Sequence, residues 1–395
     1  MQQNRLWNRN FIIIFIINIT TSISFQMMNT TLAKYTVSLG MSVGIMGLVS
    51  TSFVITSLGI RPFAGRLCDY RNKKKILMLS LIFIAVAILG YSQSNSLGFL
   101  IFFRLIHGLG WGLATTASST IATVSLPEDK IGQGIGIFAL ASVISTAIAP
   151  NLGLLLIDKF SYNAMFLVAV AMPVSGILLS LLLQIDISKL NIGRSKKSES
   201  VLNSIFAKES VMPMIIILFT TISTCSIITF LALYADERKI SGIGIFFSVY
   251  AIALFVTRPL CGKLNDLVDK RYIIIPCSAL LILTFVLLTR ADNLIIFTIA
   301  AITYGLGYGG LQPSLQTWCV KSVIPERRGV ANSTFFIGLD LGTSLGALLA
   351  GCLAQWKGYK FMYEIMILPI SIALIIYVIY MLRSRDKQLK VEYKS

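Results

Sequence analysis

Asp340 is the residue that helix packing alone explains least well, because it places a carboxyl group within an apolar stretch. It stands in the stretch FFIGLDLGTSLGALLAG, where every other side chain is apolar or small. A charge at the centre of a membrane-spanning helix costs about 2.5–3.5 kcal/mol on insertion scales, so such a group is functional by default. A carboxyl group that is costly to keep charged suits a proton carrier. We therefore predict that Asp340 binds and releases a proton; the alternative is a structural carboxylate in a hydrogen-bond network between helices.

Arg104 and His107 form a second candidate in the stretch RLIHGLG, and His107 is the only histidine of the chain. Histidine changes its charge near neutral pH, so the pair could respond to protonation. The alternative is that Arg104 fixes helix packing through backbone carbonyls and that His107 is a polar packing residue.

Further polar and aromatic side chains recur at helical spacing, which places them on single helix faces. In a membrane such faces turn inward, so we expect them to line a central substrate cavity. The candidates are Asn18, Ser22, Gln26, Asn29, Trp111, Thr115, Thr220, Thr224, Tyr304, Tyr308 and Gln312. Tyr250 could also meet an aromatic ligand, although a core or lipid-facing role fits it equally.

Composition indicates which structural elements hold these residues in place. The chain has 395 residues, 55% hydrophobic and only 13% charged, against about 25% charged in soluble domains. Apolar runs long enough to cross a bilayer predict an all-α protein with twelve transmembrane helices. The expected spans are 9–34, 41–64, 75–94, 97–124, 131–157, 162–184, 211–234, 241–262, 272–290, 293–321, 329–355 and 359–382. The spans 75–94, 162–184, 272–290 and 359–382 are almost wholly apolar and should face lipid or pack outside.

Charge sets the expected orientation. The net charge of +17 comes from short basic clusters between spans, which argues against nucleic-acid binding. Most lysines and arginines outside the spans fall on the side of the N-terminus, so the positive-inside rule predicts both termini in the cytoplasm. No cleavable signal peptide is evident, and the six cysteines form no CxxC pair, which argues against disulfides or a metal site.

A repeat divides the chain. RPFAGRLCDY from Arg61 matches RPLCGKLNDL from Arg258, and HGLGWG from His107 matches YGLGYG from Tyr304 at the same offset. Two matches at one offset indicate two copies of a six-helix unit, as in parallel-repeat transporters. We expect a six-helix bundle at 1–184, a cytoplasmic linker at 185–210, a second bundle at 211–382 and a cytoplasmic tail at 383–395.

Three of these stretches resemble the major facilitator superfamily. They are GRLCDYRNKKK from Gly65, RLIHGLG from Arg104, and APNLG from Ala149, the last a degraded form of an antiporter motif in which Ala149 and Leu154 replace glycines. His107 stands where the family usually has glutamine. The resemblance is to the twelve-helix drug:proton antiporter branch, and it implies two pseudo-symmetric bundles, a proton-coupling role for Arg104 and function as a monomer.

The resemblance also implies a conformational latch. Asp69 would dock on the helix that starts near Gly329, and Asp266 on the helix 131–157, where a helix N-terminus stabilises a carboxylate. The latch residues are Gly65, Arg66, Asp69, Arg71, Gly262, Lys263 and Asp266.

The expected function is therefore proton-coupled antiport that exports small amphipathic molecules through the cell membrane, with a small-molecule substrate, the proton and the lipid bilayer as partners and no cofactor. Export of an opine-type metallophore and proton-coupled uptake by a symporter of the same fold are alternatives. A membrane enzyme or receptor is disfavoured because the sequence has no GxxxxGK[ST] loop, no HExxH and one histidine.

Overall fold

The computed structural model describes residues 5–38, 46–94, 96–184 and 205–392, and these form helices and no strand. The first half contains α1 (Arg9–Ser38), α2 (Met46–Tyr70), α3 (Lys73–Ser92), α4 (Leu97–Val124), α5 (Ile131–Lys159) and α6 (Tyr162–Leu181). The second half contains α8 (Val211–Glu237), α9 (Gly244–Leu267), α10 (Arg271–Thr289), α11 (Leu294–Lys321), α12 (Arg328–Ile365) and α13 (Ile367–Glu392). Single-turn 3-10 helices at Glu128–Lys130, Lys208–Ser210 and Pro325–Arg327 precede α5, α8 and α12.

The prediction of twelve spans is confirmed, although the last two crossings form one helical run. Eleven helical runs of the described residues are long and apolar enough to cross a membrane, and the last, Pro325–Arg383, has 59 residues. At 1.5 Å per residue that run would measure about 88 Å, roughly three times the hydrocarbon thickness. It breaks at Lys357 and Gly358, where Gly358 has φ 83°, a conformation that favours glycine. The break divides the run into the two predicted crossings.

Two of the helix ends that differ from the prediction carry the repeated motif. We expected spans to stop at 64 and 262, but α2 continues to Tyr70 and α9 to Leu267. Asp69 and Asp266 therefore lie in the last helical turns and not in loops. The apolar pattern marks where a helix leaves hydrocarbon, whereas the backbone hydrogen bonds of a helix can continue past that point.

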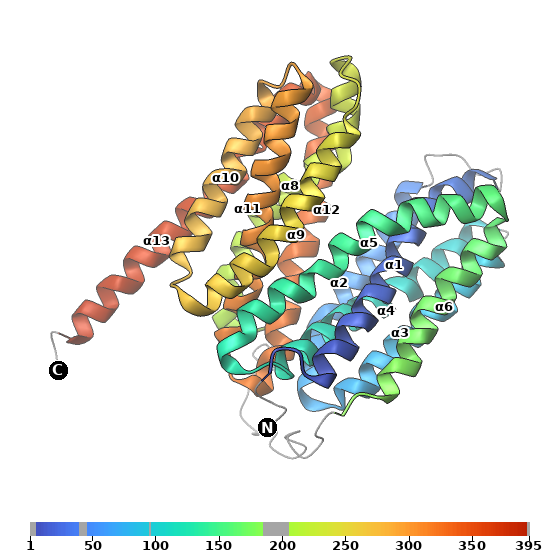
Figure 1. The fold of residues 1–395 in the computed structure, drawn as a ribbon, viewed down its shortest axis with the longest axis horizontal. Coiled ribbons are helices and arrows are strands. Elements are labelled where there is room, and N and C mark those ends of the chain that lie inside the picture. Colours follow the sequence, from blue (N-terminus) through green and yellow to red (C-terminus); the bar gives the residue numbers. More distant parts are fainter. Residues whose placement is uncertain (1–4, 39–45, 95, 185–204, 393–395) are drawn as a thin grey trace.

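The helices form two bundles, one for each half of the chain (Figure 1). One buried apolar cluster draws on residues 6–183 with Val320, and another on residues 216–377. In Figure 1, α3 and α6 lie on the outer side of one bundle and α10 and α13 on the outer side of the other. These four helices carry exposed leucines and isoleucines, among them Leu79, Leu178, Leu283 and Ile375, as expected for surfaces that face lipid.

The bundles meet at one end and diverge toward the other (Figure 1). The N-terminus lies at the end where they meet, because Asn8 donates a hydrogen bond to the Ser125 carbonyl just before α5. Asp69 and Asp266 also lie at this end, which we call the motif end. Most of the predicted linker, residues 185–204, lies outside the described residues. The predicted tail starts within α13, which extends to Glu392.

Candidate functional site

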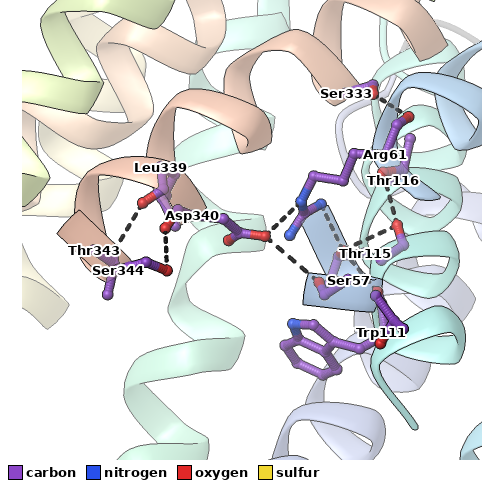
Figure 2. A network of polar contacts seen from close by, with 12 residues as sticks. Ser57, Arg61, Trp111, Thr115, Thr116, Ser333, Leu339, Asp340, Thr343 and Ser344 are labelled. Atoms are coloured by element: carbon purple, nitrogen blue, oxygen red, sulfur yellow. Dashed lines mark hydrogen bonds and ion pairs between the residues drawn. The ribbon is translucent and has the colours of Figure 1, made fainter. Parts of the chain in front are cut away.

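Asp340 of α12 pairs with Arg61 of α2 across the boundary between the bundles. The Arg61 Nε donates to Asp340 Oδ2 at 2.6 Å (Figure 2). The Arg61 side chain is 2% exposed and that of Asp340 is 20% exposed. The guanidinium is therefore enclosed, while the carboxylate can still be reached by water or a proton.

Three further groups hold Arg61 in place, and a fourth contacts Asp340. Its Nη1 donates to Thr115 Oγ1 of α4 at 3.2 Å, and its carbonyl accepts a hydrogen bond from the Ser333 hydroxyl of α12. The guanidinium also lies over the Phe336 ring, 4.7 Å from its centroid. Ser57, one turn earlier on α2, approaches Asp340 Oδ2 at 3.5 Å. The predicted residues Asp340 and Thr115 thus meet around an arginine that the sequence analysis did not select.

Arg258 of α9 occupies the position that matches Arg61 in the repeat, and it too is buried, with 3% of its surface exposed. Its Nη2 donates to Gln312 Oε1 of α11 at 2.9 Å, as Arg61 does to Thr115 at the matching position. Its Nη1 donates across the bundle boundary to the Ala139 carbonyl and to Ser142 Oγ of α5, the latter at 2.8 Å. The sequence offered one reason to select these two arginines: each is the first residue of a repeated segment and lies within an apolar span.

Arg104 and His107 form a separate cluster inside the first bundle. His107 Nδ1 lies 3.0 Å from the Tyr91 hydroxyl, and the Arg104 guanidinium lies over the rings of Phe53 and Tyr91. Arg104 Nε and His107 Nε2 are buried without a hydrogen-bond partner among the described residues. Neither residue contacts Asp340, so the structure does not join the predicted proton-coupling residues into one group.

Aromatic candidates of the second half lie together. Tyr250 stacks on Tyr304 at 4.4 Å between ring centroids, and Tyr304 on Tyr308 at 5.7 Å. Tyr250 and Tyr308 are half-buried, whereas Tyr304 is buried. Thr220 and Thr224 differ from the expected cavity lining: both are buried, because α8 packs closely against the glycine stripe of α12 and against α11.

Two of the four α1 candidates form hydrogen bonds to α5. Asn18 Nδ2 donates to the Phe138 carbonyl at 3.3 Å, and Gln26 Nε2 to Thr146 Oγ1 at 2.8 Å. Ser22 is buried and Asn29 is exposed. A small cavity between α1 and α4 has Asn18 and the predicted Trp111 and Thr115 in its lining.

The two motif aspartates lie where the resemblance placed them. Asp69 accepts backbone N–H groups of Gly329 and Val330 at 2.7 and 2.9 Å. Asp266 accepts those of Gly132 and Gln133, each at 2.8 Å. Each carboxylate thus caps a helix of the opposite bundle, where the partial positive charge of a helix N-terminus stabilises it.

The other predicted latch residues divide into two groups. Gly65 and Gly262 lie at the tight contacts: a Cβ on Gly65 would come within 2.7 Å of Ser333 Cβ, and one on Gly262 within 2.8 Å of the Gly132 carbonyl. Arg66, Arg71 and Lys263 are exposed, and in the described part of the chain they make no hydrogen bond or ion pair between the bundles.

Two ion pairs that the sequence analysis missed strengthen the motif end. Lys321 reaches Asp266 Oδ1 at 2.6 Å, within the second bundle. Arg328, at the start of α12, donates to both Glu128 oxygens at 2.5 and 2.6 Å and thereby joins the bundles. In the sequence these charges stand at or just beyond the ends of apolar spans, as ordinary surface charges do, so no sequence pattern distinguishes them, although the structure buries the side chains of Arg328 and Asp266.

Two related bundles that meet around buried charges define a membrane transporter of the twelve-helix kind. The sequence profile of the Major Facilitator Superfamily matches residues 14–245 and 238–394. The chain therefore belongs to this superfamily, whose members are transporters and not enzymes, and it is a multi-pass membrane protein.

Three relatives are named as an efflux pump, a multidrug resistance protein and an export protein. The multi-drug resistance efflux pump PmrA homolog of Lactococcus lactis is 24% identical over 90% of each chain. The multidrug resistance protein MdtG of Rahnella sp. is 26% identical over 90% of this chain and 89% of its own. The staphylopine export protein of Staphylococcus aureus is 25% identical over 83% of this chain and 85% of its own.

Solved structures show the same fold at low identity. FucP, a superfamily transporter in an outward conformation, superposes with a TM-score of 0.79 at 14% identity, over 94% of this chain and 98% of that one. The human organic anion transporter MFSD10 superposes with a TM-score of 0.77 at 14% identity, over 93% of this chain and 98% of that one.

Proposed function

We propose that this protein exports small amphipathic organic molecules in exchange for protons, by alternating access between its two bundles. The observation that carries the proposal is the Arg61–Asp340 ion pair, which joins α2 of one bundle to α12 of the other and leaves the carboxylate partly exposed. A charge pair at this position makes the contact between the bundles depend on one proton.

Protonation of Asp340 would remove the negative charge that Arg61 faces, and with it the Coulombic attraction between the bundles. A neutral carboxyl group can still accept a hydrogen bond from the guanidinium, but the bond then lacks the attraction between two opposite charges. A proton bound to Asp340 therefore favours separation of α2 from α12.

The motif aspartates oppose that separation. Their four hydrogen bonds to backbone N–H groups exist only while the bundles meet at the motif end. By the positive-inside rule this end faces the cytoplasm, so the arrangement described here is open toward the outside. A proton arriving from outside would then loosen α2 from α12 and allow the cytoplasmic end to open, which is the step that antiport requires.

The relatives named as efflux or export proteins support export as the direction of transport. The side chains expected to line the substrate cavity support an amphipathic substrate. Aromatic rings at Tyr250, Tyr308 and Trp111 lie near hydroxyl and amide groups at Thr115 and Gln312. Such surfaces suit molecules with an apolar body and a few polar groups.

The test is proton-driven accumulation of a chemical panel by everted membrane vesicles. The protein should accumulate its substrates when the vesicle interior is acidic, and Asp340→Asn should lower this accumulation roughly tenfold or more because the proton site is lost. Exchange of labelled for unlabelled substrate, which needs no proton gradient, should persist in Asp340→Asn.

Asp340→Glu is the matched control, because it keeps an ionisable group at the same place and should retain part of the proton-driven rate. Full proton-driven transport by Asp340→Asn would remove Asp340 from the coupling mechanism. Accumulation with the opposite gradient would favour an uptake symporter.

A further inference from the structure

Arg258 is a buried cation that no carboxylate of the described residues neutralises. Among the described residues its hydrogen-bond partners are a backbone carbonyl, the Ser142 hydroxyl and the Gln312 amide oxygen, all of them neutral. None of the ion pairs of the described residues includes it. Its Nε is buried and has no partner at all. A buried charge without a counter-ion is costly, so its presence in a membrane helix requires an explanation.

The repeat supplies a direct comparison. Arg61 and Arg258 match in sequence, and each begins an Arg-Pro pair. Arg61 binds Thr115 of α4 and Arg258 binds Gln312 of α11, and these two partners also occupy matching positions of the repeat. Asp340 completes the first site from the opposite bundle. The position of α5 that matches Asp340 is Val143, an apolar residue buried against Leu254 of α9. The second site therefore has the cation of the first site but lacks its acid.

The surroundings of Arg258 suit a flat organic molecule. The tyrosine stack of Tyr250, Tyr304 and Tyr308 lies on the same two helices, α9 and α11, as Arg258 and Gln312. The site also borders accessible space, since Ser142 is exposed and Gln312 is partly exposed. Arginine next to aromatic rings recognises carboxylates through its planar fork and flat ligands through stacking.

We propose that Arg258 and Gln312 bind the anionic group of the cargo, a carboxylate or a chemically similar group, while the cargo's ring lies against the tyrosine stack. The cargo class is then amphipathic aromatic anions or zwitterions. This inference rests on the proposed export function, whose substrate it specifies.

The contacts to α5 give the site a dependence on conformation. Arg258 Nη1 bonds to Ala139 and Ser142 of the opposite bundle only while α5 and α9 are in contact. When the bundles separate at the motif end, the guanidinium loses these partners and can bind an anion. When they meet again, the α5 groups compete for the guanidinium and weaken its hold on the cargo. Binding at the motif end and release at the other end follow from this competition.

The experiment measures equilibrium binding in lipid nanodiscs, without a proton gradient, using 2-naphthoate and its neutral counterpart 2-naphthamide. Equilibrium dialysis against protein-free nanodiscs corrects for partition into lipid. The protein should bind the naphthoate about tenfold more tightly than the amide, as one charge-assisted hydrogen bond predicts. Arg258→Gln should lower this ratio to about one, and Arg258→Lys should keep part of it.

A second variant tests the same site independently, in case Arg258→Gln does not fold. Gln312→Glu puts a carboxylate of nearly the same shape beside Arg258, as Asp340 stands beside Arg61, and should abolish the preference for the naphthoate while the protein stays folded. Gln93→Glu, the same change at an exposed position of α3's C-terminal end, should keep the preference.

The inference fails if the unaltered protein binds neither compound or binds both equally, or if the preference survives in Gln312→Glu. These outcomes differ from failure of the proposed function, because binding of an anion needs no proton. A protein that prefers the naphthoate yet shows no proton-driven transport would keep the anion site and lose the antiport mechanism.

Discussion

The two repeat-related arginines show how one buried position can serve different purposes in the two halves. Arg61 faces Asp340, whereas the hydrogen-bond partners of Arg258 among the described residues are all neutral. Taking a guanidinium out of water is costly, and a partner charge offsets the cost only with good geometry. The 2.6 Å contact between Arg61 and Asp340 provides it, so removal of one partner should cost more than removal of both.

A double-mutant cycle tests this expectation. Arg61→Met should lower the free energy of unfolding by about 2–3 kcal/mol, because Asp340 loses its counter-ion. The double variant Arg61→Met/Asp340→Asn should recover much of that loss. Chemical unfolding in detergent micelles gives the free energies. Arg66→Gln, an exposed arginine of the same helix, is the control and should change stability by less than about 0.5 kcal/mol. A loss in the double variant equal to the sum of the losses in Arg61→Met and Asp340→Asn would show that the two residues do not stabilise each other.

At the scale of helices, two close crossings hold the bundles together: α2 on α12 and α5 on α9. Gly65 lies against Val330 and Ser333 of α12, and Gly132 against the Gly262 carbonyl of α9. Small residues allow backbones to approach closely, which is how helices associate where lipid supplies no hydrophobic force between them. The glycine stripe of α12 serves a different contact: Gly338, Gly342 and Gly346 lie against backbone carbonyls of α8.

Gly65→Ala should force α2 and α12 apart at the motif end. The added Cβ would lie 2.7 Å from Ser333 Cβ and 2.9 Å from Val330 Cα, and such overpacking costs about 1–3 kcal/mol. Gly59→Ala on the same helix meets nothing within 4 Å and should have no such effect.

The distance between spin labels at the exposed positions Lys75 and Glu326, one on each bundle, measures the separation in a variant without native cysteines. Gly65→Ala should shift the distribution to longer distances, and Gly59→Ala should leave it unchanged. An identical distribution in both variants would mean that the glycine contact does not hold the helices together.

At the scale of the molecule, the two predicted latch contacts follow one pattern. Asp69 with Gly329 and Val330, and Asp266 with Gly132 and Gln133, are related by the same offset as the repeated segments. The contacts therefore recur on both sides of the boundary between the bundles, and both must break for the motif end to open. Arg328 and Glu128 add an ion pair on one side only, which gives that side a further contact to break.

Asp69→Asn and Asp266→Asn should each raise the fraction of molecules that are open at the motif end. Loss of a carboxylate at a helix N-terminus costs about 1 kcal/mol, which corresponds to a roughly fivefold change in the equilibrium. The double variant should show the sum of the two free-energy changes, because the sites share no residue. The same pair of spin labels measures the populations. If Asp69→Asn leaves the populations of the closed and open forms unchanged, Asp69 has no part in the latch.

Much of the architecture was predictable, because the bilayer imposes its rule on every segment. A run of about 20 apolar residues must be a helix in hydrocarbon, so the number of spans followed from composition along the chain. The ends of α2 and α9 did not follow, since a helix can extend beyond the apolar run. Asp340 could be selected for its charge, and Thr115, Tyr308 and Gln312 for their helical spacing.

The sequence by itself determined the twelve spans and the twofold repeat, and it marked Asp340 as costly to bury. Only the tertiary structure decided that the partner of Asp340 is Arg61 and not Arg104 or His107, and that no acid in the described part of the chain pairs with Arg258. The physical reason is that helical periodicity fixes which face of a helix a residue occupies, whereas the rotation and depth at which helices of opposite bundles cross depend on packing along their whole length.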